Sequence, residues 1–286
     1  MEPLRTGYVA AFGVGTTIAL LLLLRLWQRV VRPAHTVTKD LAGANPAWRM
    51  AQVGEAVAVF LLASAVVQNC LTGEGLLRDV GVVAAFGVAG LVLVQGLGHA
   101  AARLLLRGKL RAELDRGNVA AGIAAASHDV AVGLLASKAV AGSDLHALSL
   151  SLVFFALGQV AHLGGATLFR ALTTYDDAEQ IEGENVAAAI SYGGVTLAVA
   201  IVVARALEGD FESWRTSLKG FALLVAWVLA LYPTRQLVVQ TLLLGARPRL
   251  RGGALDDGIA QRHDVGVAAM EAGTYIAAAT AIARLA

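Results

Sequence analysis

Eight long apolar segments, separated by short charged stretches, constrain the fold of this chain more than any other feature of its sequence. Each contains roughly the 20 mainly apolar residues that a helix needs to cross a bilayer. Their apolar period is helical, whereas the strands of a membrane barrel would be shorter and alternating. The segments span 7–31, 47–69, 77–106, 118–141, 145–171, 184–207, 214–244 and 263–284. We therefore expect an all-α, polytopic bundle of eight transmembrane helices.

The composition supports a membrane location and excludes several other classes of protein. Hydrophobic residues make up 57% of the chain and charged residues 15%, whereas soluble domains carry roughly 25% charged residues. The net charge of +2 is too small to suggest nucleic acid binding. Cys70 is the only cysteine, so an intramolecular disulfide and a cysteine-based metal site are both excluded. The lipid bilayer is the expected partner.

The distribution of basic residues predicts the orientation in the membrane. The loops after the first, third, fifth and seventh segments, with the adjoining segment ends, hold 15 of the 23 Lys and Arg residues. Basic residues concentrate on the cytoplasmic side of membrane proteins. We therefore expect a multi-pass protein of the bacterial inner membrane with both termini in the periplasm.

Four of the segments share one opening pattern. Each begins with a side chain suited to capping a helix by accepting a hydrogen bond from a free backbone N–H: Asn45, Asn118, Asn185 and Asp264. Nine positions after each cap is a small residue: Gly54, Ser127, Gly194 and Gly273. Small residues three or four apart give a helix a flat face for close packing, either within one chain or between the chains of a homo-oligomer.

The loops before the second and sixth segments also match, which reveals the size of the repeat. Thr36-Val37-Thr38-Lys39-Asp40 corresponds to Thr173-Thr174-Tyr175-Asp176-Asp177. The unit is therefore four helices, present as residues 1–142 and again as residues 143–286. An even number of helices per unit predicts that both copies insert in a parallel orientation, unlike the inverted repeats of many transporters.

These features resemble a known bacterial membrane family, domain of unknown function 350. The resemblance rests on the openings Gly-Asn-Val-Ala-Ala-Gly-Ile at 117–123 and Glu-Asn-Val-Ala-Ala-Ala-Ile at 184–190, and on the Thr-containing acidic loop. It covers nearly the whole chain as two copies and implies architecture rather than chemistry. The second segment departs from the pattern at Pro46 and Trp48, and the eighth has Asp264 in place of Asn.

Ionisable residues inside the apolar segments form a layer at one depth. Counted at 1.5 Å per residue, they lie roughly 10–17 Å from the cytoplasmic helix ends. The candidates for an ion or proton pathway are Glu55, His99, His128, Asp129, His162 and Glu271. Three further residues, Arg25, Arg235 and Tyr192, are candidate charge partners. Ionisable groups are costly in a bilayer and mark functional sites by default.

Matched depth on consecutive helices predicts two buried ion pairs, Arg25 with Glu55 and Arg235 with Glu271. Next to Arg235, Pro233 lacks a backbone N–H, so we also expect a bend or a freed carbonyl there. His99 faces the following segment at nearly the level of His128.

Two interpretations of this layer remain open. In the first, protons, ions or a small solute move through it, because His titrates near neutral pH. In the second, the charges only lock helix contacts, the histidines bond to backbone, and the protein is a structural or membrane-stress protein. Its acidic loop, with Asp176, Asp177 and Glu179, would then recruit a soluble cytoplasmic partner. The sequence contains no nucleophile–base pair and no tight ligand spacing among its histidines, so we expect no enzymatic activity, metal or cofactor.

Overall fold

The computed structural model describes residues 3–32, 43, 45–105, 107–249 and 251–286, and the side chains of residues 3–5, 99 and 101–105 lie outside the description. Within this part of the chain all regular structure is helical, and eight helices are long and apolar enough to cross a membrane. Seven of these are α1 (Pro3–Val31), α3 (Pro46–Cys70), α4 (Leu76–Leu105), α6 (Val119–Ala139), α7 (Leu145–Leu172), α9 (Val186–Ala206) and α13 (Val265–Leu285). The predicted bundle with eight spans is confirmed.

The remaining span, the seventh in chain order, changes its winding along its length. Its successive parts are α10 (Trp214–Ala226), the 3-10 turn η1 (Trp227–Ala230), α11 (Leu231–Thr234) and the π-helix η2 (Arg235–Leu243). Pro233 lies between the tighter and the wider winding and cannot donate the hydrogen bond that a regular α-helix would require there. The irregularity expected beside Arg235 is therefore present. π-helical turns occur frequently at functional sites.

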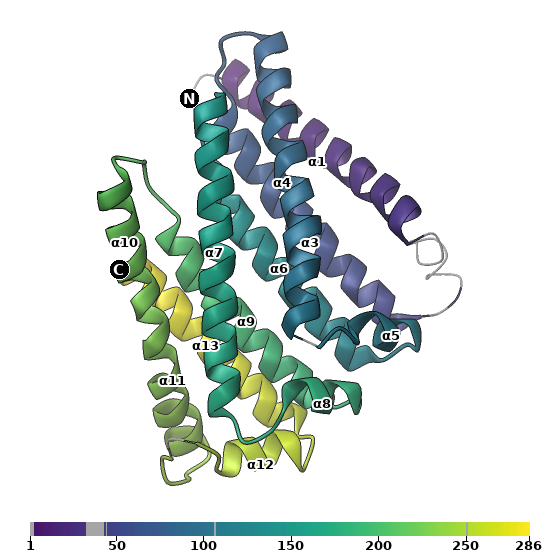
Figure 1. Ribbon diagram of the computed structural model, residues 1–286, viewed down its shortest axis with the longest axis vertical. Helices are drawn as coiled ribbons and strands as arrows, with labels where there is room; N and C mark the ends of the chain where they lie inside the picture. Colours follow the sequence, from purple (N-terminus) through teal and green to yellow (C-terminus); the bar gives the residue numbers. More distant parts are fainter. Residues whose placement is uncertain (1–2, 33–42, 44, 106, 250) are drawn as a thin grey trace.

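Three short helices, which the apolar pattern did not predict, precede spans at one end of the bundle (Figure 1). They are α5 (Leu110–Asp115) before α6, α8 (Asp177–Glu182) before α9, and α12 (Ala254–Ala260) before α13. Each buries at least one apolar side chain: Leu114, Ile181, and Leu255 with Ile259. Each is only one or two turns long, too short for a periodic apolar signal.

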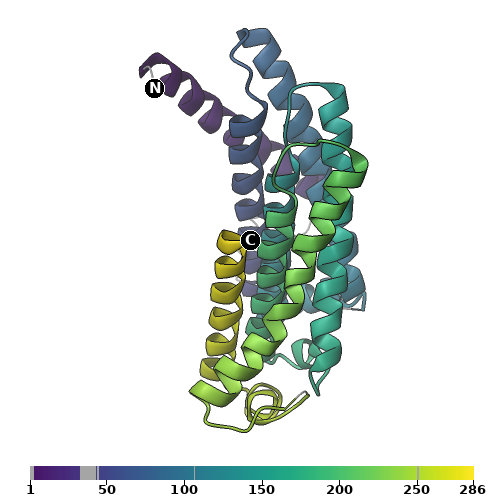
Figure 2. The ribbon, with the colours of Figure 1, turned by 90° about the vertical axis from the view of Figure 1, so that its left-hand side faces the viewer.

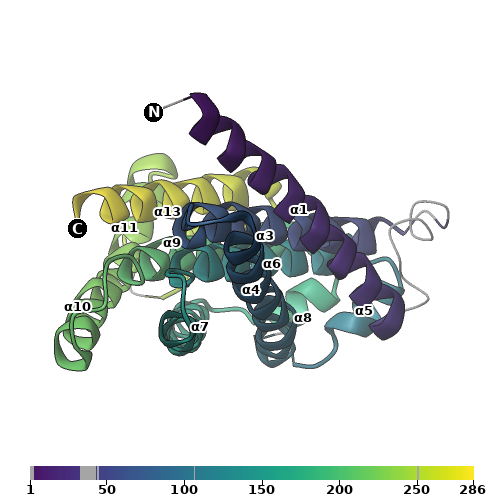
Figure 3. The same cartoon turned by 90° about the horizontal axis from the view of Figure 1, so that it is seen from above.

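The helices α3, α6, α9 and α13 lie side by side in chain order and form a central row (Figure 1). The helices α4 and α7 lie along one side of this row, and α1 runs diagonally over α3, from the opposite side to the side of α4 (Figure 3). The first turns of α1 lean away from the bundle (Figure 2). Neighbouring helices of the row approach closely, because a Cβ atom at Gly54 would overlap the backbone of Ala126, and one at Gly194 would overlap that of Ala272.

All four predicted N-caps are present at the start of the row helices. The side chains of Asn45, Asn118, Asn185 and Asp264 accept hydrogen bonds from the backbone N–H three residues later. The three asparagines also donate to the short helix that follows in the row. Asn45 Nδ2 bonds Leu114 O at 2.9 Å, Asn118 Nδ2 bonds Ile181 O at 2.7 Å, and Asn185 Nδ2 bonds Ile259 O at 2.8 Å. Each cap thus fixes one helix start against the next.

Candidate functional site

The first cluster of buried charge surrounds Glu55 on α3. Its carboxylate accepts hydrogen bonds from Gln28 Nε2 at 2.6 Å and from Arg32 Nη2 at 2.5 Å. The Arg32 guanidinium lies 5.0 Å from the centre of the Trp48 ring, where a cation–π contact is favourable. All four side chains are buried. The positive charge of Arg32 thus compensates the carboxylate of Glu55 inside the bundle.

The predicted pairing of Arg25 with Glu55 is wrong. Arg25 lies on the exposed side of α1, and Glu55 is paired with Arg32 instead. The buried stripe of α1 runs at four-residue intervals through Thr16, Leu20, Leu24, Gln28 and Arg32. Arg25 follows Leu24 directly, so its side chain points about 100° away from this stripe. The i, i+4 spacing of Gln28 and Arg32 is the sequence signal that would have identified them.

The second cluster surrounds Arg235 on η2, and the predicted contact with Glu271 is present. The guanidinium Nε donates to Glu271 Oε1, and Nη2 donates to Asp256 Oδ1 at 2.5 Å. All three residues are about 1% exposed. Ser191 Oγ donates to the second Glu271 oxygen, and Thr174 bonds Asp256 through both its N–H and its hydroxyl.

Asp256 was missed because it lies outside the apolar segments, between the seventh and eighth spans. The short helix α12 carries its side chain into the bundle. Arg235 therefore contacts two carboxylates, so this cluster carries one net negative charge when all three groups are ionised. The π-helical winding begins at Arg235 itself.

His128 on α6 and His162 on α7 are a further pair of buried ionisable residues. His128 Nε2 is 3.1 Å from Gly98 O, and His162 Nε2 is 3.1 Å from Thr196 O. A carbonyl only accepts hydrogen bonds, so Nε2 carries the proton in both rings. The ring centroids are 5.7 Å apart. These backbone contacts are the ones expected if the histidines are structural.

His162 and a residue one turn before it on α7 have buried polar atoms without a hydrogen-bond partner among the described residues. His162 Nδ1 and both amide atoms of Gln159, one turn away on α7, are buried and make no hydrogen bond to a described residue. Buried polar groups of this kind are usually satisfied by ordered water. This part of α7 therefore has hydrogen-bonding capacity that the described side chains do not use.

The other predicted residues have separate surroundings. Asp129 is buried on α6, directly after His128. Tyr192 is buried on α9, but its partner is Arg170, whose guanidinium lies 5.7 Å from the ring centre. Arg170 also bonds Asp177 at 3.1 Å. Burial raises the pKa of the Asp177 carboxyl to about 6, although the Arg170 charge opposes this shift.

The predicted pathway residue His99 is one of the residues whose side chains the structure does not describe. Among the side chains that are described, no three His, Cys, Asp or Glu residues are placed to hold a metal ion.

The two repeats differ in the space beside their charged clusters. In the first repeat a cavity of about 540 Å³ is bounded by α1, α3, α4, α5 and α6, and its wall includes Glu55, Asp129, Arg32, Gln95 and Trp48. This volume lies within the range of small-molecule sites. In the second repeat the space beside Glu271 and Arg170 is only about 10 Å³, room for roughly one water molecule.

A larger cavity, of about 1080 Å³, lies near the other helix ends, between α3, α6, α7, α9 and α10. Both large cavities use α3 and α6. On α6 the last residue of the smaller one is Asp129, and the first residue of the larger one is Leu134. At 1.5 Å per residue, these positions are separated by only about 8 Å along the helix.

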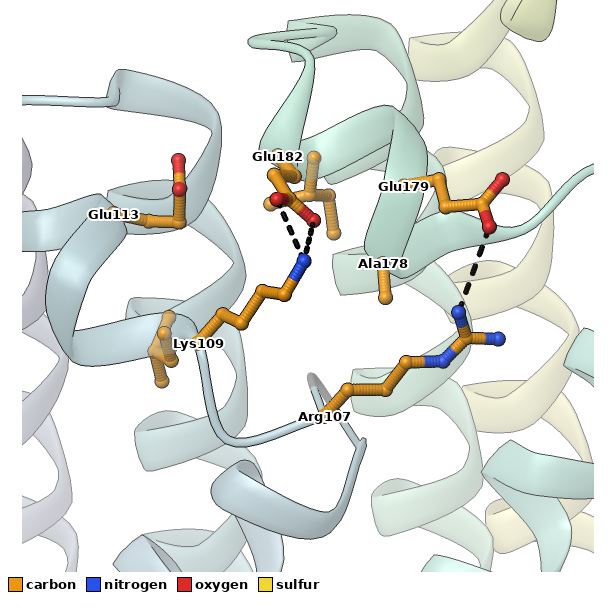
Figure 4. A pocket seen from close by; sticks show the side chains of 8 residues that line it. Arg107, Lys109, Glu113, Ala178, Glu179 and Glu182 are labelled. Carbon is orange, nitrogen blue, oxygen red and sulfur yellow. Dashed lines mark hydrogen bonds and ion pairs between the residues drawn. The ribbon is translucent and has the colours of Figure 1, made fainter.

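The charged loops of the two repeats contact each other at the end where the short helices lie. Lys109 Nζ donates to both Glu182 oxygens, at 2.8 and 2.9 Å, and Arg107 lies 3.6 Å from Glu179 (Figure 4). Arg107 also contacts Asp176. Burial would raise the pKa of Glu113, but hydrogen bonds from Arg116 and Asn118 lower it overall. Acidic residues of the second repeat, among them Asp176, Glu179 and Glu182, are thus paired with basic residues of the first.

Comparison with known proteins agrees with the repeat. A family model described as Domain of Unknown Function (DUF350) matches residues 4–140 and, a second time, residues 143–285. The chain belongs to this family. The two matches confirm the predicted tandem arrangement, and each covers four of the eight spans of this DUF350 protein.

A curated relative supports the membrane location. The UPF0719 transmembrane protein of Aquifex aeolicus (strain VF5) is 31% identical over 104 residues, which are 36% of this chain and 39% of that protein. The match therefore covers less than half of the relative's length. Its name states a transmembrane location and no activity. No solved structure matches this DUF350 protein. The chain is a multi-pass membrane protein.

Proposed function

We propose that this protein moves protons or a small cation across the membrane through its layer of buried ionisable residues. One observation carries the proposal: two buried carboxylates, Glu55 and Asp129, line a cavity of about 540 Å³ inside a bundle of membrane-spanning helices. A purely structural ion pair needs no space beside it. Ionisable groups that face a cavity inside a membrane are typical of ion and proton pathways.

The route continues from this cavity through the histidines. Asp129 lines the cavity on α6. His128, the residue before it, lies 5.7 Å, between ring centroids, from His162. The unused hydrogen-bonding atoms of His162 and Gln159 favour a water molecule in this region. An imidazole ring can accept a proton on one nitrogen and donate one from the other, so His128 and His162 are suited to act as relays.

The second large cavity provides the opposite opening. Since α3 and α6 pass from one cavity to the other within a few residues, only a short barrier separates the two spaces. Buried Val59, Leu62, Val132 and Leu135 lie on these helices and form apolar core there. A modest shift of α3 against α6 would change which cavity reaches the polar layer. This arrangement fits transport by alternating access.

Flux measurements on reconstituted protein test the proposal. The purified chain is inserted into liposomes that contain a pH-sensitive dye, and a potassium diffusion potential drives cation entry. We expect Asp129→Asn and Glu55→Gln to reduce proton or cation flux at least 10-fold. Glu74→Gln, which changes an exposed carboxylate, is the matched control and should retain wild-type flux.

Thermal unfolding of the same variants separates transport from a structural role. If Asp129→Asn retains the wild-type unfolding temperature and loses flux, the carboxylate belongs to the pathway. If wild-type liposomes show no flux above empty liposomes, and the variants lose only stability, the layer is structural.

The second cluster favours a structural role for part of the layer. Arg235, Glu271 and Asp256 are buried, Arg235 pairs with both carboxylates, and the space beside Glu271 is only about 10 Å³. We infer that this cluster fixes η2, α12 and α13, while the pathway runs from the cavity beside Glu55 past His128 and His162. Recruitment of a cytoplasmic partner is less well supported, because Asp176, Asp177 and Glu179 are engaged by Arg107 and Arg170.

The basic-residue bias supports insertion in the bacterial inner membrane with both termini periplasmic. In that orientation the smaller cavity, the short helices and the paired loops face the cytoplasm. The larger cavity faces the periplasm.

A further inference from the structure

A small cavity lies inside the second repeat, between α7, α8, α9 and α13. Its free volume is about 10 Å³, the space of roughly one water molecule. Two buried carboxylates line it, Asp177 from α8 and Glu271 from α13. Apart from the guanidinium of Arg170, the other polar side chains of its wall carry hydroxyl groups. These are Thr173, Ser191, Tyr192, Thr196 and Tyr275.

Two of these hydroxyl groups, on Tyr192 and Thr196, are buried and make no hydrogen bond to a described residue. The two residues are one turn apart on α9 and are 2% and 0% exposed. A threonine within a helix can donate its hydroxyl to the carbonyl four residues earlier, as Thr234 and Thr280 do. Thr196 makes no such bond to the described carbonyl of Tyr192. Since buried hydroxyls nearly always have a partner, both oxygens are available to a ligand in the cavity.

The buried charges around the cavity do not balance. Arg170 bonds Asp177 at 3.1 Å, and Arg235 bonds both Glu271 and Asp256. When these five groups are ionised, three carboxylates face two guanidinium groups, which leaves one negative charge. The charge of Glu271 also reaches Asp177, because it adds to the raised pKa that burial mainly produces there. A net charge inside the protein is costly unless a counter-charge compensates it.

We propose that this cavity binds one alkali metal cation, with the carboxylates of Asp177 and Glu271 and the hydroxyl oxygens of Tyr192 and Thr196 as its ligands. Hard cations bind carboxylate and neutral oxygen atoms. One positive charge cancels the one negative charge that the two arginines leave. The ion enters without its hydration shell, because the space is no larger than a water molecule. This size admits Na⁺ or K⁺ and excludes the larger Cs⁺.

A divalent ion suits the cavity less well. Its two charges would exceed the single charge to be compensated, and no three described His, Cys, Asp or Glu residues converge on one point. A bound alkali cation would instead tie α8, α9 and α13 together. The cavity beside Glu55 is bounded by other helices, so occupancy of this site does not depend on the proposed transport.

Thermal unfolding of the purified full-length chain in mild detergent tests the site. At pH 8 and constant ionic strength, N-methylglucamine chloride is replaced stepwise by NaCl, KCl or CsCl. A ligand that binds only the folded state raises the unfolding temperature as its concentration increases. We expect this rise with NaCl or KCl and none with CsCl. An equal rise with all three salts would be a general salt effect and would overturn the proposal.

Thr196→Val gives a sharper test, because it removes one ligand oxygen and keeps the shape of the side chain. We expect the variant to need at least a 10-fold higher cation concentration for the same rise. Its stability in N-methylglucamine chloride should not fall, since the hydroxyl that it loses has no partner among the described residues. The matched control is Thr280→Val, whose hydroxyl bonds Ile276 O within α13, and it should respond as wild type. Asp177→Asn should abolish the rise.

Two further results would refute the cation site. The first is stabilisation by acidification alone, with no effect of Na⁺ or K⁺ at pH 8. A proton would then cancel the excess charge, and the cavity would hold only water. The second is an identical cation response in wild type, Thr196→Val and Asp177→Asn, which would place any bound cation elsewhere in the protein.

Discussion

The imidazoles of His128 and His162 lie 5.7 Å apart, between ring centroids, where α6 of the first repeat meets α7 of the second. The His128 ring is hydrogen-bonded to the backbone carbonyl of Gly98 on α4, and the His162 ring to that of Thr196 on α9. A proton on either ring is therefore close to the other repeat. This contact joins a residue of the first repeat, next to the cavity residue Asp129, with a residue of the second.

Replacement of His162 tests whether this connection carries protons. We expect His162→Phe to reduce proton flux at least 10-fold at pH 7, because the ring keeps its approximate shape and loses its titratable nitrogens. The measurement is the initial rate of dye quenching in liposomes. His146→Phe alters an exposed histidine on the same helix and should leave the rate unchanged. Equal rates for His162→Phe and wild type would remove this residue from the pathway.

Removal of Arg235 tests the structural role of the second cluster. Arg235→Met leaves Glu271 and Asp256 buried without their cation, which typically costs about 3–5 kcal/mol. We expect a loss of this size in the free energy of unfolding, measured by denaturant titration in mild detergent. Arg25→Met, on the exposed side of α1, should change stability by less than about 0.5 kcal/mol. Similar losses for both variants would contradict the assignment.

The raised pKa of Asp177 predicts how stability depends on pH. This pKa is about 6 in the folded protein, against an ordinary value of 3.8. Between these values the folded state binds more protons than the unfolded state, so stability falls as pH rises from about 4 to about 6. The expected decrease from this group is on the order of 2–3 kcal/mol.

Unfolding measured at pH 4.5 and pH 7 checks this expectation. Asp177→Asn should show a smaller difference between the two conditions than wild type does. An unchanged difference would mean that Asp177 titrates normally in the folded protein.

The predicted orientation can be tested with reporter fusions at the C-terminus. Alkaline phosphatase, which folds only in the periplasm, should be active when fused after Ala286. Green fluorescent protein exported unfolded to the same side should be dark. The opposite result would place both cavities on the reverse sides of the membrane and invert the proposed direction of opening.

The parts of the site within apolar segments could be predicted from the sequence. Arg235 and Glu271 are isolated charges at matched depth on consecutive helices, and a bilayer leaves such charges few partners other than each other. The four caps could be predicted too, since the pattern of Asn or Asp before a run of small residues has a local cause.

The partners outside the apolar segments could not be found in this way. Arg32 follows the last residue of α1 and lies outside the predicted first segment. Matched depth within the segments therefore pointed to Arg25 as the partner of Glu55, instead of Arg32. Asp256 reaches Arg235 only because α12 folds back under the bundle, which depends on the packing of Leu255 and Ile259 rather than on local pattern. The difference in free volume between the repeats likewise arises from side chains that meet only in three dimensions.

Cation entry into liposomes that contain only the purified wild-type chain tests the central claim most directly. With an imposed potential, negative inside, we expect the internal pH or cation signal to change at a rate proportional to the number of reconstituted chains. Glu55→Gln should abolish this dependence while the protein remains folded. A signal equal to that of protein-free liposomes, for protons and for the alkali cations alike, would contradict the account.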